Sequence, residues 1–171
     1  GGKAKAMVVT SSREHVVRYK HEFDTYLKEK EYHDIKALVA FSGTVLLDGI
    51  PPEYTEAGMN GFGEKELPAR FATSEYQILL VAEKYQTGYD EPLLHTMYVD
   101  KRLDGVKAVQ TLSRLNRTCP GKEDTFVLDF VNKREDILVA FQPYYEQTQL
   151  TDTTDPNKLY DLKNKIDSFQ V

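Results

Sequence analysis

The apolar stretch Gln77-Ile78-Leu79-Leu80-Val81-Ala82 decides the fold. Its side chains do not alternate between apolar and polar, which is typical of a strand buried on both faces. Strands of this kind occur mainly in parallel sheets, because helices cover both faces of such a sheet. The stretch therefore predicts the central strand of an α/β domain.

Strand-like and helix-like segments alternate on both sides of this stretch. Upstream, short apolar runs flank a segment whose apolar residues recur at helical spacing, which predicts a parallel crossover. Downstream the same alternation continues. The expected strands are 6–9, 35–41, 77–82, 95–99 and 125–130, and the expected helices are 13–30, 67–73 and 106–117. This order predicts a doubly wound, mainly parallel sheet with helices on both faces.

Two regions depart from this alternation. Residues 48–67 are rich in glycine, proline and acidic residues, which predicts an irregular surface insertion without an assigned helix or strand. After the last strand, two further helices are expected, at 135–147, where Pro143 should kink or split the helix, and at 157–169. We therefore expect one domain over 1–132 and a helical extension over 133–171.

Composition excludes several classes of protein. The chain has 171 residues, with 27 acidic and 22 basic ones, so a net charge of −5 excludes a strongly basic coat for nucleic acid. The single cysteine, Cys119, favours a reducing compartment. No apolar run approaches the ~20 residues that a membrane span needs, so we expect a cytoplasmic protein without membrane contact. Because the sequence begins with Gly1 and Gly2 rather than methionine, we also expect an excised fragment of a longer parent.

The loop after the central strand is a candidate ligand-binding segment. Gly88 can bring its backbone close to a ligand, and Asp90 follows two residues later, where it could grip a ribose. The alternative is a simple glycine turn with a solvated aspartate, since both residues are common in turns.

A second candidate lies on the helix 106–117. Gln110, Arg114 and Arg117 are spaced i, i+4, i+7 and should share one helix face. Two arginines on one face suit a phosphate, because guanidinium groups make two-pronged contacts with phosphate oxygens. The alternative is a solvated basic stripe that is paired with nearby acidic residues.

The order of these segments resembles a known family. Gly88-x-Asp90-x-Pro92, then a strand that ends at Asp100, then Gln110-x-x-Ser113-Arg114-x-x-Arg117 is the order of motifs V and VI in the second RecA-like domain of superfamily 2 helicases. The stretches 97–103 and 110–117 resemble, more narrowly, the motor (R) subunit of type I restriction enzymes. Residues 6–13 resemble motif IV of the same domain.

The resemblance implies a role for each matched residue. Arg114 and Arg117 would act as arginine fingers on the ATP γ-phosphate, with Gln110 assisting, while Gly88 and Asp90 would frame the nucleotide. Weaker candidates for contact with DNA phosphates are Ser11, Ser12, Arg13 and Thr87. Many family members have a threonine where this chain has Glu83, which argues against a DNA contact at that position.

The resemblance also implies what the chain works with. Partners would be duplex DNA, a first RecA-like domain of the same chain, and the methyltransferase and specificity subunits of a restriction-modification complex. The 171 residues contain neither Gly-x-x-x-x-Gly-Lys-Thr nor an Asp-Glu-x-His box, so a first domain would bind most of the ATP and Mg²⁺. The isolated chain should therefore be inactive, although the whole subunit would be an ATP-dependent site-specific deoxyribonuclease. No histidine has metal-ligand spacing, so no metal site is expected.

Two alternatives to the restriction motor remain open. One is a domain from another superfamily 2 DNA or RNA helicase. The other is a non-catalytic α/β module that binds a partner or a phosphorylated ligand through its arginines.

Overall fold

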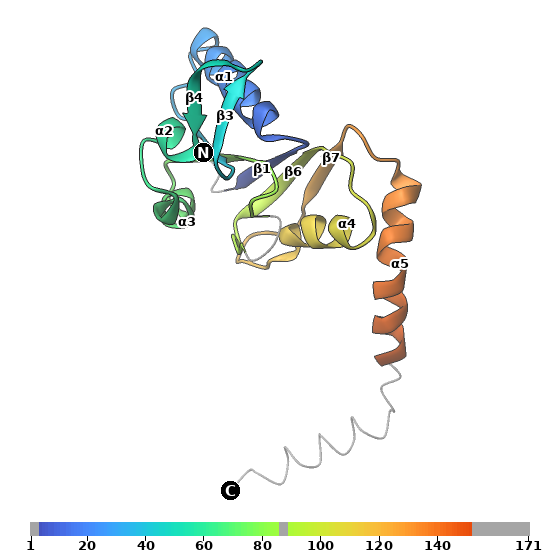
Figure 1. The fold of residues 1–171 in the computed structure, drawn as a ribbon. Coiled ribbons are helices and arrows are strands. Elements are labelled where there is room, and N and C mark those ends of the chain that lie inside the picture. The colour runs from blue at the N-terminus through green and yellow to red at the C-terminus, as the bar shows by residue number, and fades with distance from the viewer. Residues whose placement is uncertain (1–3, 86–88, 152–171) are drawn as a thin grey trace, which may run out of the picture.

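The computed structural model describes residues 4–85 and 89–151 and is built on a five-stranded sheet (Figure 1). Every pairing within this sheet is parallel, and the strand order is β2-β5-β1-β6-β7. The strands are β1 Lys5–Thr10, β2 Ala37–Ala40, β5 Ile78–Val81, β6 Leu94–Asp100 and β7 Phe126–Asp129. The five predicted parallel strands are thus confirmed. The apolar stretch forms the interior strand β5, but β1 rather than β5 takes the middle position.

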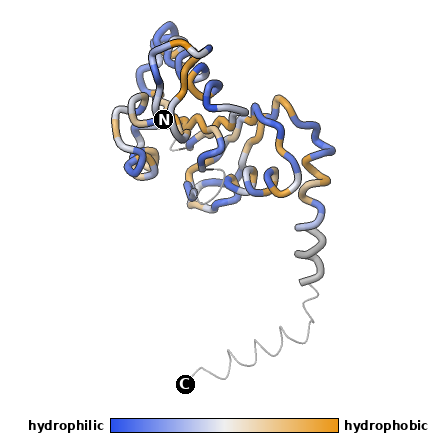
Figure 2. Tube along the Cα trace, in the orientation of Figure 1, coloured by the Kyte–Doolittle hydropathy of each residue, from blue (hydrophilic) through white to orange (hydrophobic). Residues whose placement is uncertain are grey.

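Helices cover both faces of this sheet. On one face, Val16 and Val17 of α1 (Arg13–Glu29) join a buried cluster with the strand residue Val39. On the opposite face, α3 (Leu67–Ala72) and α4 (Gly105–Leu112) pack against the strands. The inner strands are mainly apolar, whereas α1 is largely hydrophilic along its length (Figure 2). The predicted doubly wound, RecA-like α/β class is therefore confirmed.

The insertion is more regular than the sequence predicted. A two-stranded antiparallel hairpin forms from β3 (Thr44–Leu47) and β4 (Ile50–Thr55). The helix α2 (Glu56–Asn60) and the 3₁₀ helix η1 (Glu64–Glu66) follow it. Prolines at 51 and 52 obscure a strand in the sequence, but a two-stranded hairpin tolerates them because each of its strands has an unpaired side. The expectation of no strand or helix in this region is therefore wrong.

The insertion also protects an edge of the main sheet. Strand β2 lies at that edge, so one side of its backbone has no neighbouring strand. The side chain of Asn60 accepts a hydrogen bond from the Val39 N–H (2.9 Å) and donates one to the Val39 carbonyl (2.8 Å). Glu56 Oε2 accepts from the Phe41 N–H at 2.8 Å. Two side chains of α2 thus replace the hydrogen bonds of a sixth strand.

This arrangement makes Asn60 important for stability. Because Val39 is fully buried, Asn60→Ala should leave a buried N–H and carbonyl without partners, at a cost of about 2 kcal/mol. Denaturant unfolding of the chain measures this loss. The exposed Asn116→Ala serves as the control and should change stability by less than about 0.5 kcal/mol. Equal stability of the two variants would contradict the role of Asn60.

The first of the two predicted carboxyl-terminal helices is present. Helix α5 (Arg134–Thr151) runs through Pro143 as one element and lies against α4, so Pro143 does not split it. The expected helix at 157–169 lies outside the described residues. The boundary near residue 132 stays a prediction. Within the described ranges, no helix combines the length and the apolar character of a membrane-spanning segment.

Candidate functional site

The predicted arginine segment has a different local geometry from a plain helix. Helix α4 ends at Leu112, and the tighter 3₁₀ helix η2 (Ser113–Asn116) follows it. Arg117 comes after η2 in extended conformation, with φ −72° and ψ 129°. The expectation that Gln110, Arg114 and Arg117 share one helix face is therefore wrong for Arg117, because the helix ends before it.

The structure nevertheless brings the two predicted segments together. Arg114 Nη1 donates a hydrogen bond to the Tyr89 carbonyl at 2.6 Å. Arg117 Nε lies 2.8 Å from Asp90 Oδ1, and both side chains are more than half exposed. We call Tyr89, Asp90, Arg114 and Arg117 the arginine cluster. Gly88, which was predicted to lie beside them, falls outside the described residues.

Tyr89 anchors this cluster, although the sequence analysis did not select it. Its buried ring packs against Tyr85, with centroids 4.7 Å apart, and against Phe71 at 6.5 Å. Burial raises the pKa of its hydroxyl. The packed ring fixes the backbone carbonyl that receives Arg114. Every residue has a backbone carbonyl, so the sequence does not mark this one as a hydrogen-bond acceptor. The only sequence feature that could have indicated its role is the aromatic residue between Gly88 and Asp90.

Charges within the cluster are partly balanced. Burial lowers the pKa of Arg114, the neighbouring Arg117 lowers it further, and Asp90 opposes both effects. An arginine remains charged under such shifts, because its intrinsic pKa lies far above neutral pH. The cluster therefore presents two guanidinium groups against one carboxylate and can bind an anion. Gln110 is exposed and contributes its backbone carbonyl, which accepts from the Ser113 hydroxyl at 3.3 Å.

The position of the cluster differs from the usual site in a parallel sheet. Ligand sites of such sheets lie outside the carboxyl ends of the strands, where we expected the informative loops. Pro92 and Lys122, which are hydrogen-bonded beside the cluster, instead lie shortly before β6 and β7 begin. The connection from β5 to β6 leads from the carboxyl end of β5 to the amino end of β6. Near this amino end, Tyr89 and Asp90 meet the two arginines of the cluster.

The other predicted residues line a separate hollow at the carboxyl ends of β1, β2 and β5. Its volume is about 470 Å³, and its lining residues are Ser11, Ser12, Arg13, Ser42, Ala82, Glu83 and Lys84. Ser12 caps α1 by accepting from the His15 N–H (3.2 Å), and Arg13 Nη1 donates to the Ser42 carbonyl (2.9 Å). We call this the serine hollow. Thr87, the fourth predicted DNA contact, lies outside the described residues.

Charge in the serine hollow is mixed. Arg13 and Lys84 contribute cations, but Glu83 is 82% exposed at the rim and lies 3.7 Å from Lys101. Lys84 is itself paired, at 2.9 Å from Glu56 and 2.7 Å from Glu64. A carboxylate at this rim would repel phosphate, and the expectation that Glu83 does not contact DNA stays a prediction.

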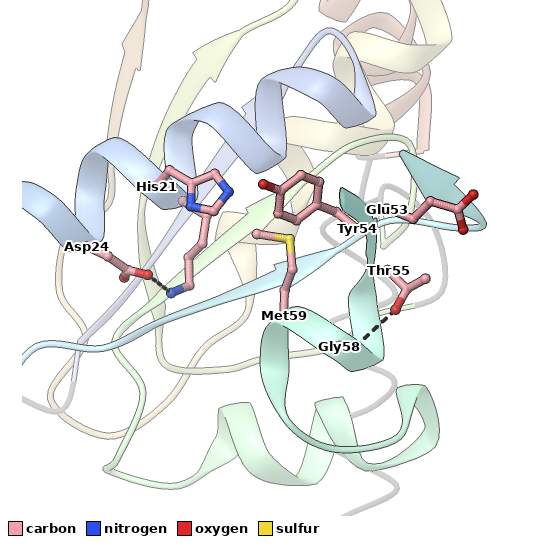
Figure 3. A pocket seen from close by; sticks show the side chains of 8 residues that line it. His21, Asp24, Glu53, Tyr54, Thr55, Gly58 and Met59 are labelled. Carbon is pink, nitrogen blue, oxygen red and sulfur yellow. Dashed lines mark hydrogen bonds and ion pairs between the residues drawn. The ribbon is translucent and has the colours of Figure 1, made fainter. Parts of the chain in front are cut away.

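A third hollow of about 330 Å³ lies between α1 and the insertion (Figure 3). Here the His21 ring meets Tyr54 edge-on with centroids 5.1 Å apart, which packs the hairpin against α1. The Thr55 hydroxyl accepts from the Gly58 N–H at 3.1 Å. Both contacts have a structural role. Across the described ranges, no group of three histidine, cysteine or acidic residues could hold a metal ion.

Comparisons with known proteins support the family resemblance. The family model for domain 3 of the type I restriction enzyme subunit R matches residues 51–132. Over 140 residues, the chain is 34% identical to the endonuclease subunit assigned to the type I restriction enzyme MjaVIIP of Methanocaldococcus jannaschii. It is 25% identical over 153 residues to the HindI endonuclease subunit of Haemophilus influenzae. The predicted resemblance to type I restriction R subunits is confirmed.

The similarity to R subunits covers most of the chain but little of each relative. The two alignments include 75% and 85% of the chain and span 13% and 14% of the relatives' lengths. The region matched by the R-subunit family model contains all residues of the arginine cluster. Most residues that line the serine hollow precede this region in the sequence.

Solved structures of restriction enzymes share the fold. The ATP-dependent type ISP restriction-modification enzyme LlaBIII bound to DNA has a TM-score of 0.54 at 15% identity, over 83% of this chain and 10% of that one. A fragment assigned as an HsdR subunit from Vibrio vulnificus has a TM-score of 0.52 at 19% identity, over 82% of this chain and 24% of that one. These identities support the fold alone.

Proposed function

We propose that the chain is the second motor domain of an ATP-dependent translocase of double-stranded DNA, within the R subunit of a type I restriction enzyme that translocates and cleaves DNA. The observation that carries this proposal is the arginine cluster. Arg114 and Arg117 come from one motif and meet Tyr89 and Asp90 from the other, in a chain similar to R subunits. A solvated basic stripe would explain the exposed pair of Arg117 and Asp90, but not the part-buried hydrogen bond from Arg114 to the Tyr89 carbonyl.

The cluster fits the triphosphate of ATP as a binding partner. Asp90 engages Nε of Arg117, and a guanidinium group carries further N–H donors that suit phosphate oxygens. The Tyr89 carbonyl and the Asp90 carboxylate orient both arginines before a nucleotide arrives, which reduces the cost of ordering them. ATP and Mg²⁺ would be bound mainly by a first RecA-like domain, with this domain supplying the arginine fingers.

The serine hollow is the candidate contact for DNA. Hydroxyl groups of Ser11 and Ser12 and the guanidinium of Arg13 are the kinds of donors that hold phosphate oxygens. The hollow lies at the end of the sheet opposite the arginine cluster, so closure of the two motor domains around ATP could move the hollow relative to the DNA backbone. Cycles of closure and opening would then step the duplex along.

The remaining partners follow from the proposed membership in an R subunit. They are the first RecA-like domain of the same chain and the methyltransferase and specificity subunits of a restriction-modification complex. The proposed location is the cytoplasm, where such a complex meets DNA.

The proposal is tested in the intact R subunit by measuring DNA-stimulated ATP hydrolysis and translocation. Arg114→Ala and Arg117→Ala should slow both activities while thermal melting stays unchanged. Normal hydrolysis in both variants would reject the motor assignment.

The 171-residue chain by itself should not hydrolyse ATP, because its sequence lacks a phosphate-binding loop. It should also bind duplex DNA weakly, given its net charge of −5. Phosphate release with and without DNA measures the first expectation, and a salt titration of DNA binding measures the second. Hydrolysis above background that disappears in Arg117→Ala would show that the chain binds ATP productively by itself.

A further inference from the structure

We propose that Lys122 is a positioning residue for the arginine cluster. The inference rests on the proposed function, because it concerns how the two arginines are held for their reaction. Lys122 belongs to no motif that the sequence analysis identified. It lies in the connection between η2 and β7, and its side chain reaches back to both segments of the cluster.

The Lys122 ammonium group binds three backbone carbonyls. Nζ donates to the Arg117 carbonyl at 2.6 Å, to the Leu115 carbonyl at 2.7 Å and to the Pro92 carbonyl at 3.3 Å. An ammonium group has three N–H donors, so these contacts use its full capacity. The carbonyls of Leu115 and Arg117 lie where η2 ends and lacks the next turn of amide donors, and a lysine near a helix end commonly satisfies such groups.

The local chain is shaped to bring this lysine back. The Lys122 N–H bonds to the Cys119 carbonyl at 3.1 Å, which closes a turn. Gly121 within the turn has φ +82°, a left-handed conformation that favours glycine. The turn therefore directs the side chain of Lys122 toward η2 and the Pro92 loop.

The contacts of Lys122 differ from the contacts that Arg114 and Arg117 make with the neighbouring loop, because they do not involve a guanidinium group. Arg114 reaches Tyr89, and Arg117 reaches Asp90, through the same guanidinium groups that we assign to the phosphate of ATP. When these groups turn to a phosphate, their links to the neighbouring loop weaken. The hydrogen bonds of Lys122 join the same segments through backbone carbonyls and use neither guanidinium group. They can therefore hold the cluster together while the arginines act on the nucleotide.

The test uses the intact R subunit with DNA, Mg²⁺ and ATP. Lys122→Met keeps most of the side-chain length but removes the three donors. We expect its kcat for ATP hydrolysis to fall by about 10- to 100-fold with a small change in KM, since misplacement of a catalytic group lowers mainly the reacting step. Lys107→Met, at an exposed lysine of α4, is the matched control and should hydrolyse ATP at the normal rate.

A double variant separates positioning from general stabilisation. If Lys122 acts through Arg117, adding Lys122→Met to Arg117→Ala should cause little further loss, whereas an independent structural defect would multiply the two losses. Lys122→Arg keeps the charge and part of the hydrogen bonding, so it should retain the fold and give an intermediate rate. If Lys122→Met misfolds, Lys122→Arg takes its place in the test. A normal rate of ATP hydrolysis in Lys122→Arg would contradict the inference. Losses that multiply when Lys122→Arg is combined with Arg117→Ala would contradict it as well.

The two proposals fail in different ways. Normal hydrolysis in Arg117→Ala would reject the proposed function and the role of Lys122 with it. Slow hydrolysis in Arg117→Ala together with a normal rate in Lys122→Met would reject the positioning role alone. Slow hydrolysis in both single variants, with no further loss in the double variant, would support both.

Discussion

Replacement of Arg117 by alanine in the intact parent of the proposed motor domain should slow DNA-stimulated ATP hydrolysis by about 10³- to 10⁵-fold, the range that arginine fingers contribute in other nucleotide hydrolases. Arg114→Ala should have an effect of similar size. The reason is that a guanidinium group compensates charge on the transferring phosphoryl group, so its loss raises the barrier of that step. Steady-state phosphate release measures the effect, and thermal melting monitors the fold.

Two further variants separate charge, geometry and surface effects. Arg117→Lys keeps the positive charge but loses the planar two-pronged guanidinium, so it should remain well below the normal rate. Arg102→Ala is the matched control, because Arg102 forms a similarly exposed pair with Asp104 at 3.3 Å. An exposed pair contributes ~0 to 1 kcal/mol to stability, and this one lies outside the proposed site, so its loss should leave hydrolysis normal. A rate in Arg117→Ala close to that of Arg102→Ala would exclude the finger assignment.

The sequence was sufficient to predict the sheet because buried parallel strands leave a direct pattern. Residues 78–81 are apolar at every position, and the structure places them in β5 between two other strands. The position of β5 within the sheet could not be predicted in the same way. The middle strand β1 is less apolar than β5, since it contains Lys5 and Thr10, so apolar composition does not identify the middle of the sheet and only the strand order does.

The candidate site was predictable only in part. The spacing of Arg114 and Arg117 drew attention to them, but it could not show that the α-helix ends at Leu112. Contacts through backbone carbonyls were invisible in the sequence, because any residue could supply the oxygen atoms that receive Arg114 and Lys122. The insertion was assigned no structure because its edge-capping contacts depend on β2, which is distant in the sequence.

Lys84→Met should destabilise the chain by about 3 kcal/mol at neutral pH, since breaking a buried ion pair leaves an unpaired charge. Glu56 is 1% exposed, and its Oε2 lies 2.9 Å from Lys84 Nζ. Lys84 is 19% exposed, which places the expected cost near the lower end of the range for buried pairs. Denaturant unfolding measures the loss. Lys36→Met, which removes an exposed pair with Glu75 at 2.9 Å, should cost at most about 1 kcal/mol.

The cost of Lys84→Met should also depend on pH in a defined direction. Burial raises the pKa of Glu56, and hydrogen bonds from Lys84 and from the Phe41 N–H partly oppose this shift. Removing Lys84 therefore raises the pKa of Glu56 further. A carboxyl group with a raised folded-state pKa favours folding below its unfolded pKa, and this advantage is lost as pH rises through the folded value.

Lys84→Met should therefore destabilise the chain least in acid, where Glu56 is protonated in both the folded and the unfolded state. It should destabilise the chain most above the folded-state pKa of Glu56. Adding Glu56→Gln to Lys84→Met tests this origin directly. Glutamine keeps an oxygen acceptor for the Phe41 N–H but carries no charge, so the double variant should regain part of the lost stability and lose the pH dependence. If the destabilisation by Lys84→Met were independent of pH and unchanged by Glu56→Gln, Glu56 would not be the buried charge that Lys84 neutralises.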